Sequence, residues 1–126
     1  MAVVTVVTQQ MADELKQRMS DLNVRGTYCP AGYLVFSVID FIQHARINTP
    51  TYEAATCWYR DLIIRHEAVR HEVVRMKLPR GNSTYQTQTM TLRGLQMLLM
   101  LMGDKAEPEF ERAFQDIITQ FMPANV

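Results

Sequence analysis

The sequence contains little cysteine and no metal-binding motif. Its two cysteines, Cys29 and Cys57, stand far apart, and no C-x-x-C or H-E-x-x-H spacing occurs. A disulfide between them is disfavoured, because a chain of this length can build a core without one. Cys57 has no evident base to activate it, so we expect a small core residue rather than a nucleophile. We therefore expect no metal, no cofactor and no structural disulfide.

Long hydrophobic segments are also missing. The longest apolar run, Met97 to Met102, is far below the ~20 residues that a membrane-spanning helix needs. The N-terminal segment MAVVTVVTQQ lacks the basic start and long apolar core of a secretory signal. We expect no membrane partner and an intracellular, reducing location, in the cytoplasm or nucleus of a host.

The chain has no excess of charge of either sign, since 13 basic residues balance 13 acidic ones. Residues 60–80 nevertheless hold six basic and three acidic side chains, whereas residues 104–116 hold five acidic and two basic ones. Binding to a polyanion would therefore have to come from this local asymmetry rather than from the net charge.

The sequence contains no recognisable arrangement of catalytic residues. His44, His66 and His71 have no carboxylate–histidine arrangement of a recognised kind around them, and the five glycines are scattered rather than gathered in a phosphate-binding loop. The histidines are expected at the surface or at the edge of the core. We expect no catalytic residues and no enzymatic activity.

The hydrophobic spacing predicts a single α+β domain over residues 1–126, with two β-hairpins packed on about five helices. Residues 1–7 are β-prone and would form an added strand or an ordered arm. Ser37 is expected to cap a helix in a capping box, with the Asp40 side chain reaching back. The expected elements are a helix over Thr8–Leu22, a hairpin over Val24–Tyr28 and Tyr33–Phe36, helices over Val38–Ala45 and Thr51–Val69, strands over Val73–Leu78 and Thr84–Gln88, a helix ending at Met102 before Gly103, and a helix from Pro108 to Phe121.

The second hairpin is the main functional candidate. Val74, Met76 and Leu78 alternate with Arg75 and Lys77, so one face would be buried and the other cationic. Cations and neutral donors near its turn would contact phosphates. The alternative, which the local residues favour equally, is that the hairpin is an ordinary solvent-exposed edge of a sheet, whose positive charges discourage aggregation. The candidate nucleic-acid-binding residues are Arg60, Arg65, Arg75, Lys77, Arg80, Asn82, Ser83 and Thr84.

The methionine-rich helix that ends at Met102 offers a different candidate. Methionine at helical spacing is most often core, but it also forms adaptable partner grooves. A dimer interface is the form of that groove that we expect, with Met100 and Phe121 as its test positions.

The order of the elements resembles the opening and second half of viral Bro-N and KilA-N domains. In that family, a strand pair ends in an aromatic residue and passes directly into a helix with an Asp near its start. The similar segments span roughly Glu14 to Phe121 and are Val24–Tyr28, Tyr33–Ile42, Trp58–Leu62, Thr89–Leu99, Gly103–Ala106 and Phe110–Ile117.

This resemblance implies a compact α+β DNA-binding domain, found in large DNA viruses and phages and often joined to a second domain. We therefore expect a non-enzymatic domain that binds nucleic acid, most directly duplex DNA, through the basic hairpin. The alternative is a protein-interaction or self-assembly module, including a homo-oligomer, that uses the Met- and Phe-rich C-terminal helices.

Overall fold

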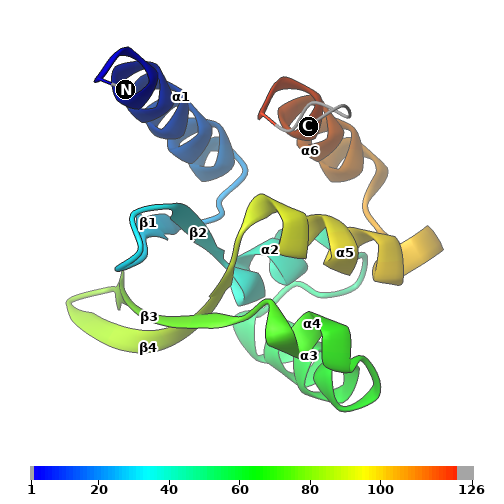
Figure 1. Cartoon of the computed structure of the whole chain (residues 1–126). Helices are drawn as coiled ribbons and strands as arrows, with labels where there is room; N and C mark the ends of the chain where they lie inside the picture. The colour runs from blue at the N-terminus through cyan, green and yellow to red at the C-terminus, as the bar shows by residue number, and fades with distance from the viewer. Residues whose placement is uncertain (1, 122–126) are drawn as a thin grey trace.

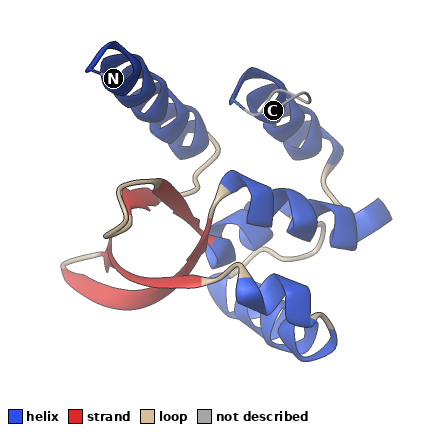
Figure 2. Ribbon diagram, viewed as in Figure 1, coloured by secondary structure: helices blue, strands red, loops and turns tan. Residues whose placement is uncertain are grey.

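The two hairpins join into one antiparallel sheet. The computed structural model describes residues 2–121, apart from the side chains of residues 2–8 and of Arg80. The strands are β1 (Gly26–Tyr28), β2 (Leu34–Ser37), β3 (Val74–Arg80) and β4 (Ser83–Met90), in the spatial order β1-β2-β4-β3. The sheet curls, and the helices lie mainly above it and at the end where β4 leaves it (Figures 1 and 2).

Helix α2 (Val38–Ala45) lies at the centre of the helical layer and follows β2 without a loop. It packs against α3 (Tyr52–Arg65), α5 (Leu92–Met102), α6 (Pro108–Phe121) and strands β2 and β4. Its Phe41 ring meets Phe110 and Phe114 edge-on, with ring centroids 5.3 Å and 4.9 Å apart, an arrangement that aromatic rings favour. The predicted helix bounds are confirmed.

Only half of the predicted capping box forms at the start of α2. The Ser37 hydroxyl accepts a hydrogen bond from the Asp40 backbone N–H, at 3.2 Å. The Asp40 carboxylate, however, accepts from Arg25 instead of reaching back to Ser37. The Ser37 N–H donates to the Arg25 carbonyl. The prediction for Asp40 was wrong because a charged partner from a distant segment offers stronger bonds than the local amide.

The helix predicted over Thr51–Val69 is interrupted. Helix α3 (Tyr52–Arg65) starts at Thr51, whose hydroxyl accepts from the Ala54 N–H, and α4 (Glu67–His71) begins after a break at His66. Ala55, Tyr59 and Leu62 form the buried side of α3. Cys57 stands about 200° around the helix from Ala55 and is exposed. The expectation that it is a core residue was therefore wrong, whereas Cys29 is buried.

The C-terminal half follows the prediction closely. Helix α5 (Leu92–Met102) ends at Gly103, which adopts a φ of 58° that a side chain would disfavour. A short 3₁₀ turn, η1 (Gly103–Lys105), leads to α6 (Pro108–Phe121). Phe110, Phe114, Ile117 and Ile118 form the buried face of α6.

Helix α1 (Ala2–Asp21) begins earlier than predicted, so residues 2–7 are helical rather than an added strand or arm. Adding turns to an existing helix costs less than nucleating new structure. The helix lies beside α6 (Figure 1), where Arg18 donates to the Gln120 side-chain oxygen and Gln120 donates to Glu14. The fold class, a small α+β domain, is confirmed.

Candidate nucleic-acid interface

The β3–β4 hairpin has one apolar and one polar face. Along β3, Leu78 is buried and Val74 and Met76 are half-buried, whereas Arg75 and Lys77 are exposed. The predicted alternation is confirmed. The register places Gln88 opposite Arg75, Gln86 opposite Lys77 and Thr84 opposite Pro79. Because residues directly opposite one another share a face, Arg75, Lys77, Thr84, Gln86 and Gln88 belong to one surface, which we call the hairpin face.

A two-residue turn closes the hairpin and sets this register. Arg80 pairs with Ser83, and Gly81 and Asn82 lie between them. Gly81 has a φ of 66°, whereas Asn82 does not have a positive φ. A positive φ at the first central position alone is the pattern of a type II′ turn, which requires glycine there. Asn82, Ser83 and Thr84 are all exposed at this tip.

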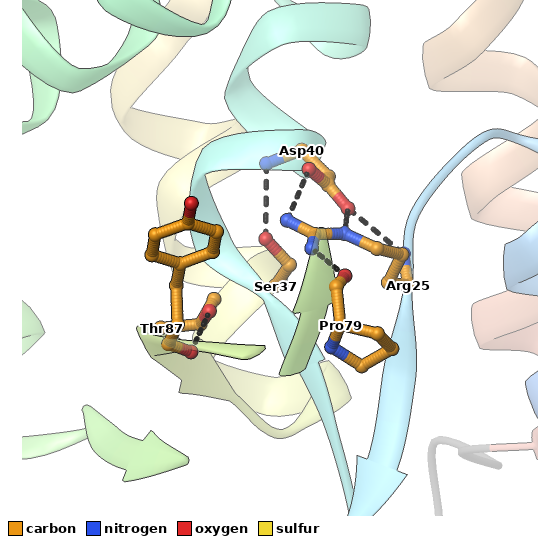
Figure 3. A network of polar contacts seen from close by, with 6 residues as sticks. Arg25, Ser37, Asp40, Pro79 and Thr87 are labelled. Carbon is orange, nitrogen blue, oxygen red and sulfur yellow. Dashed lines mark hydrogen bonds and ion pairs between the residues drawn. The ribbon is translucent and has the colours of Figure 1, made fainter. Parts of the chain in front are cut away.

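Arg25 ties the end of β3 to the rest of the fold. Its Nη1 donates to the Pro79 carbonyl at 2.7 Å, and its Nε and Nη2 donate to the two Asp40 oxygens at 2.6 Å and 3.0 Å. The Arg25 backbone N–H also donates to Asp40, at 3.1 Å. The carboxylate raises the pKa of the Arg25 guanidinium. Figure 3 shows Arg25 between the start of α2 and the end of β3.

Further along β3, Arg75 lies close enough to Tyr59 of α3 for its charge to act on the phenol. Burial raises the pKa of Tyr59 to about 12, and the positive charge of Arg75 opposes that shift. Tyr59 is almost completely buried. The base of the hairpin face therefore adjoins α3.

The raised pKa of Tyr59 predicts a loss of stability at high pH. The folded protein keeps the phenol proton that the unfolded chain releases above its usual pKa of 10.0, so folding is favoured less as the pH rises. The stabilisation is complete below pH 10 and is lost as the pH approaches about 12. Over this window the melting temperature of the wild type should fall relative to that of Tyr59→Phe, which has no phenol to ionise. Parallel curves from pH 9 to 12 would contradict it.

The other predicted site residues are distributed differently. Arg60 is exposed on α3. Arg65, at the end of α3, lines a cavity of about 430 Å³ with Met97, Met100 and Leu101 of α5, and no hairpin residue lines that cavity. Arg80 belongs to β3, but its side chain lies outside the described part of the structure.

Three further residues of the hairpin are not among the site residues predicted from the sequence. Gln86 and Gln88 share the hairpin face, and Tyr85, on the opposite face, is 53% exposed. Amides donate to phosphates and bases, and an exposed aromatic ring can stack on a base. A sequence signal was available, because residues 73–103 contain four basic residues and no Asp or Glu. Because this segment is cationic and contains no acidic residue, its polar side chains are candidates for binding nucleic acid.

The described residues supply no group of three or more His, Cys, Asp or Glu side chains able to hold a metal ion. His44 and His71 are exposed and His66 is half-buried, as predicted. Every helix within residues 2–121 is too short or too polar to cross a membrane.

No family model, curated protein or solved structure matches the chain. The resemblance to Bro-N and KilA-N domains therefore stays a prediction that rests on the residues quoted above.

Proposed function

We propose that this chain is a non-enzymatic nucleic-acid-binding domain of the viral Bro-N/KilA-N type that contacts duplex DNA through the β3–β4 hairpin. The observation that carries the proposal is the hairpin face. Two exposed cations, Arg75 and Lys77, stand beside a row of exposed or half-buried neutral hydrogen-bonding side chains. Neither strand contains a carboxylate that would neutralise them.

This combination suits a phosphate backbone. Lysine and arginine supply the charge, while amides and hydroxyls fix the position of the protein on the duplex. Asn82, Ser83 and Thr84 add exposed neutral donors at the tip, and Arg80, which is paired with Ser83 at the end of β3, adds a third cation there. Arg60 is an exposed candidate on the neighbouring helix.

The fold also supports a hairpin that keeps its shape on binding. The bond from Arg25 to the Pro79 carbonyl holds β3 near its end, and Thr89 Oγ1 donates to the Val74 carbonyl at 2.6 Å at the other end. Affinity then depends little on ordering the hairpin, which lowers the entropic cost of association.

The deciding experiment measures affinity for labelled duplex and single-stranded DNA as a function of salt. With two or three phosphates neutralised, the slope of log K against log salt should be about −2 to −3 on duplex DNA. Binding should be weak at physiological salt, because the cations are few. Absence of salt-sensitive binding to both kinds of strand would refute the proposal.

A second candidate function, self-assembly, is favoured by the exposed apolar side chains around α5. Met100 is 75% exposed and borders, together with Leu101, the cavity between α4 and α5. Ile64, which directly precedes the cavity residue Arg65, is 81% exposed. Contiguous exposed apolar side chains such as Met100 and Leu101 occur at interfaces between proteins, and a second copy of the chain is the partner we consider.

This candidate predicts a concentration-dependent dimer in multi-angle light scattering that Met100→Lys disperses. Met100 is exposed, so the substitution should leave the melting temperature nearly unchanged. Phe121 is half-buried beside α1 and is a poorer test position. Arg112→Glu, an exposed change on α6, provides the control. A monomer at all concentrations would exclude self-assembly.

A further inference from the structure

The molecule contains a second polar site, away from the hairpin, that the proposed function does not use. A cavity of about 670 Å³ lies between the end of α2, the loop to α3 and the start of α6. Its polar and charged lining residues are Gln43, His44, Arg46, Asn48, Thr49 and Glu107. No residue of the β3–β4 hairpin lines it.

The backbone on which this cavity is built is fixed from both sides. Arg46 forms an isolated antiparallel bridge with Ala106. The Ile47 N–H donates to the Lys105 carbonyl at 2.7 Å, and the Glu107 N–H donates to the Ala45 carbonyl at 2.6 Å. Arg46 and Glu107 therefore stand on two segments that are held together directly.

The Arg46 side chain is oriented but lacks an anion. Its guanidinium carbon lies 5.2 Å from the centre of the Trp58 ring, and its Nη1 donates to Thr49 Oγ1 at 3.0 Å. Its Nε is buried without a hydrogen-bond partner in the described structure. Buried polar atoms in proteins are normally hydrogen-bonded, and no carboxylate among residues 2–121 forms an ion pair with Arg46.

Glu107 is the complementary group on the other side. This residue lines the same cavity, is exposed, and forms no ion pair within residues 2–121. An oriented cation and an unpaired acid on a fixed backbone position thus border one cavity without forming an ion pair. A ligand with only a negative charge would be attracted by Arg46 but repelled by Glu107. A ligand with only a positive charge would be attracted by Glu107 but repelled by Arg46.

We propose that this cavity binds a small zwitterion of the free α-amino acid class, with its carboxylate on Arg46 and its ammonium group toward Glu107. The guanidinium is suited to a carboxylate because its nitrogens match the two oxygens in spacing and charge. Thr49 and Trp58 hold it in place. The ligand is distinguished from acetate or an amine by needing both charges.

Trp58 provides the readout, since it is the only tryptophan of the chain and lies against the Arg46 guanidinium. Glycine, alanine and leucine are titrated against the full chain without DNA, following Trp58 fluorescence and the melting temperature. Acetate, methylamine and inorganic phosphate are the single-charge probes. Saturable binding of at least one amino acid, at concentrations where the single-charge probes have no effect, is the expected result.

Two substitutions test the two charges separately. Arg46→Gln should weaken amino-acid binding by about tenfold or more, as loss of a charge-assisted pair does, while Arg112→Gln, an exposed arginine of α6, should change nothing. Glu107→Gln alters an exposed side chain, so it should fold normally. It should weaken amino acids and strengthen acetate.

The proposal is overturned if no amino acid binds, if acetate or phosphate binds the wild type as well as the amino acids do, or if Glu107→Gln leaves the preference unchanged. Because no nucleic acid is present, these outcomes are independent of the hairpin.

Discussion

Replacing Asp40 with alanine is expected to lower the free energy of unfolding by about 3 kcal/mol, near the lower end of the range for breaking a buried ion pair. The Asp40 carboxylate accepts three hydrogen bonds from Arg25, two from the guanidinium and one from the backbone. Its removal leaves a cation with a side chain only 29% exposed and an unpaired N–H. Urea unfolding monitored by circular dichroism gives the value.

The matched control for this prediction is the exposed ion pair between Glu67 and Arg70 on α4. Its side chains are 72% and 60% exposed and its N···O distance is 3.4 Å. Glu67→Ala should change the stability by no more than about 0.5 kcal/mol, as exposed pairs do. A double-mutant cycle over Arg25 and Asp40 then isolates their coupling. If Asp40→Ala costs no more than Glu67→Ala, the pair does not hold the fold.

The same network links stability to the candidate site. Arg25 is positioned by Asp40 and in turn holds the Pro79 carbonyl next to the hairpin tip. Asp40→Ala should therefore increase amide hydrogen exchange at the end of β3 more than at its beginning, where Thr89 still bonds to Val74. The Arg25 guanidinium thus links the start of α2 to the end of β3 next to the hairpin tip.

The local pattern of apolar and polar residues is sufficient to predict most of the helices and strands. The alternation along β3 and the apolar spacing of α6 predict a strand and a helix, because burial of one face determines each. The turn at Gly81 and the stop at Gly103 require glycine for backbone reasons and were equally visible. Those elements agree with the structure to within a few residues.

Other features depend on contacts that no local pattern contains. Asp40 matches a capping box, but its partner Arg25 lies 15 residues earlier and reaches it through the sheet. The helical spacing continues across His66, so the break between α3 and α4 is hidden. The general tendency of cysteine to be buried predicts a core position for Cys57, whereas the buried residues Ala55, Tyr59 and Leu62 lie on the opposite side of the helix.

In the candidate site, too, some residues follow from local sequence pattern and others depend on contacts between distant segments. The strand alternation predicted that Arg75 and Lys77 point away from the core, but membership of Gln86 and Gln88 requires the register across the turn. Arg65 and the α5 methionines border one cavity because of how the helices pack, which their separation in the sequence does not reveal. Arg46 and Glu107 are 61 residues apart in sequence and border one cavity only because the segments 45–47 and 105–107 pair.

Reversing the charge of the hairpin is expected to abolish binding to duplex DNA at low salt. The variant Arg75→Glu/Lys77→Glu/Arg80→Glu replaces each proposed phosphate contact of β3 by a group that repels the backbone. Arg75 and Lys77 are exposed, so the melting temperature should stay nearly unchanged. Electrophoretic mobility shift and fluorescence anisotropy measure the loss.

A matched variant separates the hairpin face from the net charge. Lys16→Glu/Lys105→Glu/Arg112→Glu alters three exposed cations on α1, η1 and α6 and shifts the net charge by the same amount. Long-range repulsion would weaken binding equally in both variants and would be relieved by salt. Contact at the hairpin instead predicts that only the β3 variant loses binding, and that the salt slope of the control stays close to that of the wild type. Equal loss in the two variants would remove the hairpin as the binding surface.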